Sequence, residues 1–195
     1  MTHAPFMNRW LPAALIVVLL AGFRILGSVY SDTLPNLQPL PALLLCSLVF
    51  LHGIQRWLLP LLCWLVTDPL TSLAQGYPAF GVHNFSVAFG ILVIFGISLW
   101  TRRHPRTFPV LASAAASALA FHFLTGMISF AFDPLYPKTW NGLLQAQWTG
   151  PEGYAPTWIF LRNLLAANVL FSGLFLAARS GLPRASADSL PLHAR

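Results

Sequence analysis

The residues best suited to chemistry in this sequence are eight side chains that interrupt or flank long apolar stretches. Together they could bind a small polar or anionic solute, although they form no recognisable nucleophile–base pair. A charged side chain in a bilayer costs about 2.5–3.5 kcal/mol, so it is expected to face the interior of a helix bundle and to have a partner. The candidate ligand-binding residues are Arg24, Asp68, His83, Asn84, His122, Trp140, Arg162 and Asn168.

The charged members of this set allow three interpretations, which the sequence leaves open. In the first, Asp68 pairs with Arg24 or Arg162 in a salt bridge that holds helices together. In the second, these residues line a pocket open to the outside, and one arginine is free to bind an anionic or strongly polar ligand. In the third, the two arginines extend to the outer membrane surface, as long basic side chains do.

The sequence shows no motif typical of a metal site, of a hydrolase or of a nucleotide-binding site. A histidine in an apolar helix, such as His122, is more often a hydrogen-bonded packing residue than a ligand, although beside Asp68 it could relay protons. No CxxC or HxxxH spacing supports a metal site, and Cys46 and Cys63 are expected to be packed thiols. No GxSxG, HExxH or phosphate-binding glycine-rich loop occurs, so we expect no enzyme, no cofactor and no ATPase in this chain.

The elements that position these residues are expected to be membrane helices. The chain is 56% hydrophobic and only 8% charged, whereas about a quarter of the residues in a soluble domain are charged. Its net charge of +6 comes from basic residues at the ends of apolar segments. This placement is typical of topology signals and anionic-lipid contacts, so we expect no nucleic-acid partner.

Basic residues fall on alternate connections between the apolar segments. Arginines occur before the first segment, between the second and third, between the fourth and fifth, and after the sixth. Positive charge stays cytoplasmic during insertion, which predicts an all-α bundle of six transmembrane helices with both termini cytoplasmic. The expected helices are 10–30, 40–54, 57–74, 82–101, 108–131 and 157–178, within a domain of residues 10–178 that follows the N-terminus 1–9 and precedes a disordered tail, 179–195.

One segment of small residues is expected to form a helix-packing surface, and one long connection is expected to control access of the ligand. The small residues at 112–118 favour close helix contact, either inside the bundle or against a partner subunit. The long extracytoplasmic connection 132–156 is expected to be functional. Within it, residues 139–148 predict a short amphipathic helix that lies on the outer surface and acts as a lid, with Trp140, Leu143, Leu144 and Trp148 facing the lipid or the bundle.

Several motifs resemble those of an uncharacterised bacterial family of six-span membrane proteins. They are FHFLTG at 121–126, YPKTWNGLL at 136–144, PNLQPLPA at 35–42 and Thr67-Asp68. Gly126 stands where that family usually has asparagine, and Asn168 stands near a position that is often acidic. The family looks similar to the substrate-binding S components of energy-coupling factor transporters, which work with a transmembrane coupling subunit and two ATPases.

The resemblance implies a multi-pass protein of the bacterial cytoplasmic membrane that captures a small solute from the outer side for uptake. The small-residue faces of the first helix, at Ala13, Ala14, Ala21 and Gly22, and of the fifth helix would then bind the coupling subunit. The alternative is a non-catalytic structural or assembly subunit of a larger membrane complex. An enzyme, such as a lipid-modifying transferase, is the third hypothesis.

Overall fold

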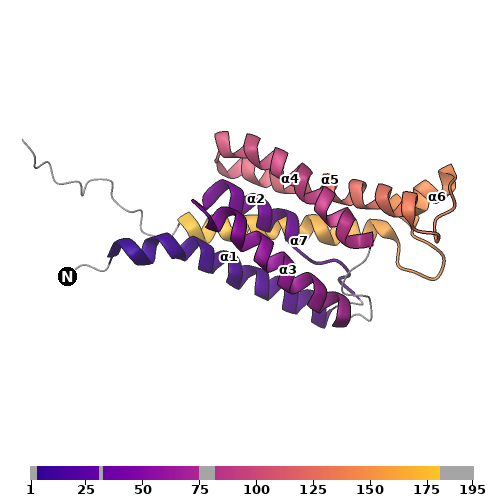
Figure 1. Cartoon of the computed structure of the whole chain (residues 1–195), viewed down its shortest axis with the longest axis horizontal. Coiled ribbons are helices and arrows are strands. Elements are labelled where there is room, and N and C mark those ends of the chain that lie inside the picture. Colours follow the sequence, from indigo (N-terminus) through magenta and orange to yellow (C-terminus); the bar gives the residue numbers. More distant parts are fainter. Residues whose placement is uncertain (1–3, 31–32, 75–81, 181–195) are drawn as a thin grey trace, which may run out of the picture.

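The computed structural model describes residues 4–30, 33–74 and 82–180, and within them it contains helices and no strand. Of the predicted disordered tail 179–195, residues 179 and 180 belong to the last helix, and the rest lies outside the described residues. The long helices run side by side in a bundle, and the shortest elements lie at its ends and centre (Figure 1). In chain order they are α1 (Ala4–Val29), α2 (Leu40–Phe50), α3 (Gln55–Ala74), α4 (Val82–Arg103), α5 (Thr107–Phe132), α6 (Trp140–Leu144), the π-helical turn η1 (Gln145–Thr149) and α7 (Thr157–Ser180).

Three of the described helices are long and apolar enough to cross a membrane: α4 over Asn84–Arg103, α5 and α7. The prediction of six such helices is therefore supported only in part. The clearest correction concerns the second helix, which was expected over 40–54 but ends at Phe50. Its 11 residues extend about 16 Å at 1.5 Å per residue, which is half of a hydrocarbon layer of about 30 Å.

The short helix α2 forms the centre of the bundle. Every residue of α2 except Val49 is buried, and the helix contacts α3, α4, α5 and α7. Pro39 and Pro41 stand at its start, where a missing backbone N–H leaves no helical hydrogen bond unmade. Proline also disfavours helical conformation in the residue before it, so the preceding segment 33–39 stays non-helical.

Two asparagines of α7, which we call the asparagine clamp, bind the backbone around this non-helical segment. Asn163 Nδ2 donates to Pro35 O at 2.8 Å. Asn168 Oδ1 accepts from Ala42 N at 2.6 Å, and Asn168 Nδ2 donates to Gln38 O at 3.5 Å and to Leu164 O at 2.6 Å. Buried backbone groups outside a helix need such partners because no water is available to them. The clamp therefore stabilises a break in regular structure beside α2.

Four of the small residues at 112–118 of α5 lie inside the bundle, whereas Ala112 and Ala116 are exposed. Ser113, Ala114, Ser117 and Ala118 are buried and recur every three or four positions, which places them on one helix face. This face packs where α5 contacts α2, α4 and α7. A hydrogen bond of 2.6 Å from Thr101 Oγ1 to Ser113 Oγ joins α4 to α5. Internal packing therefore holds for these four residues, and the predicted contact with a partner subunit stays a prediction.

The last turns of α4 and α7, which carry arginines, lie at the end of the bundle opposite α6 (Figure 1). Arg56 donates through Nε and a terminal nitrogen to Leu51 O, at 3.2 and 3.1 Å. The Arg179 guanidinium lies 4.5 Å from the centre of the Phe50 ring. These contacts join the ends of α2, α3 and α7, while Arg102 and Arg103 occupy the last turn of α4. One end of the bundle is thus strongly basic.

Candidate functional site

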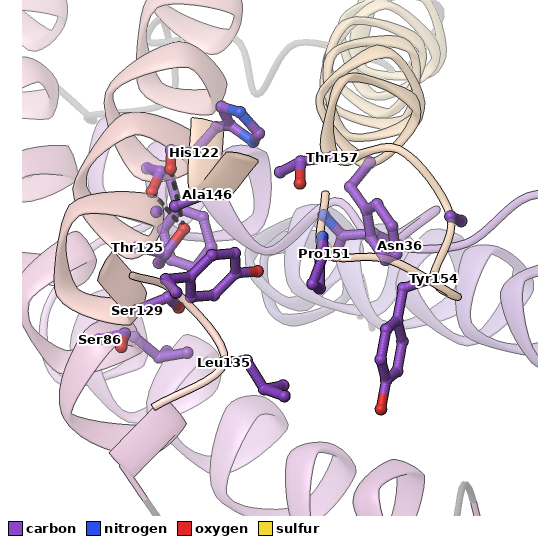
Figure 2. A pocket seen from close by; sticks show the side chains of 16 residues that line it. Asn36, Ser86, His122, Thr125, Ser129, Leu135, Ala146, Pro151, Tyr154 and Thr157 are labelled. Atoms are coloured by element: carbon purple, nitrogen blue, oxygen red, sulfur yellow. Dashed lines mark hydrogen bonds between the residues drawn. The ribbon is translucent and has the colours of Figure 1, made fainter. Parts of the chain in front are cut away.

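A cavity of about 500 Å³ lies at the other end of the bundle, where the connection between α5 and α7 folds back. We call it the end cavity. Figure 2 shows its labelled side chains around a common space, with Thr125 and Ser129 on one side and Thr157 and Asn36 on the other. Its described lining residues are Asn36, Ser86, Val87, Phe121, His122, Thr125, Gly126, Ser129, Leu135, Tyr136, Ala146, Pro151, Tyr154, Ala155, Thr157 and Phe160.

The first part of the connection, residues 136–144, forms a tight elbow. Lys138 Nζ donates to Phe130 O and, at 3.0 Å, to Asp133 O. It thereby brings positive charge to the carbonyl-rich C-terminus of α5. Thr139 Oγ1 accepts from Gly142 N at 3.3 Å and caps the start of α6.

Gly142 is the residue that lets the elbow close. A Cβ atom at this position would lie 1.8 Å from Pro137 O, so no other residue fits without moving the backbone. Local geometry therefore explains three positions of the motif YPKTWNGLL: Lys138, Thr139 and Gly142. The motif's one side chain in the described cavity lining is Tyr136. Burial, and after it the nearby Asp133 carboxylate, raise the pKa of the Tyr136 phenol above its ordinary value, so the phenol is protonated at neutral pH.

The second part of the connection, η1, forms a roof that packs on α5 and α7. His122 Nε2 lies 3.1 Å from Gln147 O, and Gln147 Nε2 donates to Phe123 O at 3.1 Å. Thr157 Oγ1 donates to Gln145 O at 3.1 Å and attaches the other side of the roof to α7. The predicted short helix is thus present as α6 and η1, and η1 lies over the bundle.

Gly126 provides the space in which this roof sits. A Cβ atom on Gly126 would lie 2.8 Å from Gln147 Oε1 and 2.9 Å from its Cδ. The position of the Gln147 side chain against α5 therefore depends on the absence of a side chain here. Because Gly126 lies one helical turn after His122, the glycine and the histidine present their surfaces to the same part of η1.

The predicted site residues separate into different surroundings. His122 is buried and lines the end cavity. Arg162 is exposed, lies over the Trp158 ring at 5.5 Å and donates to Asn163 Oδ1 at 3.1 Å. Trp140 is 82% exposed, and neither it nor the half-buried Asn84 belongs to the described lining. Asn168 belongs to the asparagine clamp.

The remaining three predicted residues are Arg24, Asp68 and His83, whose side chains lie outside the part of the chain described at side-chain level. All three interpretations of the charged residues therefore stay predictions. They are the salt bridge of Asp68 with Arg24 or Arg162, a ligand pocket lined by these residues, and the extension of the arginines to the membrane surface. Where side chains are described, no group of three His, Cys, Asp or Glu residues is close enough to hold a metal ion.

Sequence reasoning missed most of the polar lining. Thr125 and Ser129 follow His122 at spacings of three and seven residues, so all three share one face of α5. That spacing was visible in the sequence and could have identified the two hydroxyl residues. Asn36 and Tyr154 carried no such signal because each belongs to a non-helical segment, and Asn36 has a positive φ of 61°.

Comparison with known proteins gives a family but no activity. A model described as "Family of unknown function (DUF6580)" matches residues 5–188. The searches of curated proteins and of solved structures returned no match. The match agrees with the predicted uncharacterised family and gives no support to the resemblance to transporter S components.

Proposed function

The chain belongs to this family of unknown function, and we propose from its end cavity that it is a membrane-embedded solute-binding subunit without catalytic activity. It captures a small polar solute from the outer side of a bacterial cytoplasmic membrane. It then works with a transmembrane coupling subunit and ATPases, in the manner of S components.

The observation that carries this proposal is the position of the end cavity next to a broken membrane crossing. Asn36, in the non-helical segment 33–39, contributes to the cavity wall, and the half-length helix α2 follows it directly. Non-helical backbone at membrane depth is tolerated only inside protein or around a cavity. In many transporters, solute sites lie at helices interrupted in this way.

The charge distribution supports an orientation for the proposed subunit. Because positive residues stay cytoplasmic, the arginine-rich end of the bundle is assigned to the cytoplasm and the end cavity to the outer side. Segment 33–39 and α2 then make up the second of six passes together, and both termini are cytoplasmic. In this orientation, the roof formed by η1 lies between the cavity and the external medium.

A coupling subunit has its best contact surface on α1. Four small residues of α5 are buried within the bundle, and only Ala112 and Ala116 are exposed among residues 112–118. On α1, by contrast, Ala14, Ala21 and Gly22 are exposed, and their spacing places them on one face of the helix. This face permits the close approach of a second membrane helix.

The second candidate is a structural or assembly subunit without a ligand. The asparagine clamp favours it, because this pair of polar residues has a complete explanation in helix packing. In this case the intramembrane charges would also pair with one another, and the end cavity would hold only water.

The test is mass spectrometry of the full chain purified gently from its native membrane, with proteins and small molecules measured in the same sample. We expect a stoichiometric solute that is lost in Ser129→Trp, which fills the cavity. The same solute is expected to stay with Phe132→Trp, because Phe132 is exposed on the same helix and lies outside the described lining. Recovery with other subunits and no small molecule would support the structural alternative.

A further inference from the structure

The threonine hydroxyls around the end cavity have already donated their hydrogens to the protein. Thr125 Oγ1 donates to Phe121 O and His122 O, at 2.9 and 3.0 Å, and the dashed lines in Figure 2 mark both contacts. Thr157 Oγ1 donates to Gln145 O at 3.1 Å. A hydroxyl has one hydrogen and two lone pairs. Both oxygens can therefore offer a ligand only an acceptor.

His122 is restricted in the same way. Its Nε2 atom lies 3.1 Å from Gln147 O. Since a carbonyl oxygen can only accept, Nε2 must carry the hydrogen, and Nδ1 of the neutral ring is then an acceptor. Three polar residues of the cavity are thus fixed as acceptors by the roof and by the backbone of α5.

The rest of the described lining is uncharged and partly aromatic. It contains no Lys, Arg, Asp or Glu, so a charged ligand would lose its hydration without meeting an opposite charge there. Phe121, Tyr136, Tyr154 and Phe160 provide ring surfaces, which pack well against a flat aromatic molecule. The volume of about 500 Å³ lies within the usual range for small-molecule sites.

From these features we infer that the end cavity recognises an uncharged, planar molecule that presents N–H or O–H donors to Thr125, Thr157 and His122. This inference rests on the proposed solute-binding function and narrows its ligand class. Arg162 cannot supply the charge for an anionic ligand here, because it is exposed and lies outside the described lining; the side chain of Arg24 lies outside the part of the chain described at side-chain level.

The experiment compares three probes built on the same pyridine ring: nicotinamide, methyl nicotinate and nicotinate. Nicotinamide is neutral and has N–H donors, the ester is neutral without them, and nicotinate is an anion. Each is titrated into the full chain in lipid nanodiscs and followed by saturation-transfer NMR. We expect saturable binding of nicotinamide, about fivefold weaker binding of the ester, as for the loss of one net hydrogen bond, and no saturable binding of nicotinate.

Two matched variants connect this preference to a named acceptor. Thr125→Val removes an acceptor oxygen, and we expect nicotinamide to bind about fivefold more weakly while the ester is unaffected. Thr67→Val is the control, because Thr67 Oγ1 also donates to a carbonyl one turn earlier, Cys63 O, at 2.6 Å. It lies on α3, outside the described lining, and is expected to leave both affinities unchanged.

The outcomes separate the ligand class from the function. Nicotinate could bind more tightly than nicotinamide and lose this binding in the cavity-filling Ser129→Trp. That result would overturn the proposed class of uncharged, hydrogen-donating ligands, but it would support the cavity as a solute-binding site. If all three probes bind equally and Thr125→Val changes none of their affinities, the proposed class of uncharged, hydrogen-donating ligands is also wrong. If wild type shows no more saturable binding than Ser129→Trp for any probe, both the class and the proposed function fail.

Discussion

The asparagine clamp and the end cavity both place polar side chains inside the same bundle, yet they use them differently. In the clamp, the oxygen and both amide hydrogens of Asn168 are engaged by backbone groups. In the cavity, Thr125, Thr157 and His122 use their hydrogens on carbonyls and keep acceptor lone pairs available. A polar side chain whose donors and acceptors are all hydrogen-bonded within the protein stabilises the fold. One that keeps an acceptor lone pair unused can also bind a ligand.

Asn168 is separated from the cavity along α7, whereas the other clamp residue, Asn163, binds Pro35 next to the cavity residue Asn36. Thr157 and Asn168 lie on the same helix, 11 positions apart by their numbering, which corresponds to about 16 Å along the axis. A change at Asn168 is therefore expected to have little direct effect on the cavity, since distant sites usually contribute additively. The following variants test that separation, beginning with the largest expected effect.

Asn168→Leu is expected to have the largest effect on stability. It leaves the buried Ala42 N–H without its side-chain acceptor, and the penalty for such an unpaired group is about 1–3 kcal/mol. Thermal unfolding in detergent should therefore occur at a clearly lower temperature. Asn141→Leu is the control, because Asn141 is exposed on α6. An Asn168→Leu protein of normal stability that has lost its solute would remove the distinction between clamp and cavity.

Gly126→Ala should have an intermediate effect, confined to the cavity end. The new Cβ displaces the Gln147 side chain, which breaks its hydrogen bond to Phe123 O, a loss of about 1 kcal/mol. Hydrogen exchange of residues 145–149 should accelerate, while exchange in α2 stays unchanged. Gly173→Ala provides the control, since no atom lies within 4 Å of its added Cβ. Faster exchange in α2 would show that the regions are coupled.

The smallest effect is expected from the ionisation of Tyr136. Its pKa is raised, first by burial and then by Asp133, from an ordinary value of 10.0. The folded state therefore holds this proton more tightly than the unfolded state. Its contribution to stability is complete below about pH 10 and is lost as the pH rises through the folded pKa.

Tyr136→Phe provides the comparison for this titration. Solute binding should be constant from neutral pH to about pH 9 in both proteins, because the phenol stays protonated. Above that range, the stability of wild type should fall more steeply than that of Tyr136→Phe in a denaturant series. Equal slopes for the two proteins would show that the phenol is not buried against the cavity in solution.

Helix positions were largely predictable from the sequence, whereas the partners of individual polar groups were not. The helices predicted over 82–101, 108–131 and 157–178 appear as α4, α5 and α7 with small shifts at their ends. Apolar length determines such elements directly. The end of α2 was placed four residues too late, because residues 51–54 remain apolar enough to extend the pattern.

The position of Asn168 shows why the site was harder to predict. Its depth in an apolar helix led to a prediction of ligand binding, whereas the structure gives it backbone partners 126 and 130 residues earlier in the chain. Spacing along one helix cannot identify such pairs. His122, in contrast, was included among the predicted pocket residues because of its depth in an apolar helix, and it lines the end cavity.

The break before α2 has a consequence for how the protein is made. The N-terminal turn of α2 acquires its side-chain acceptor only from Asn168, 126 residues later. At typical synthesis rates of about 5–20 residues per second, α2 waits about 6–25 s for that partner. During this interval, a half-length apolar helix with unpaired backbone groups must be sheltered by the insertion machinery. Nascent chains that stop before α7 are therefore expected to be recognised as incomplete and degraded.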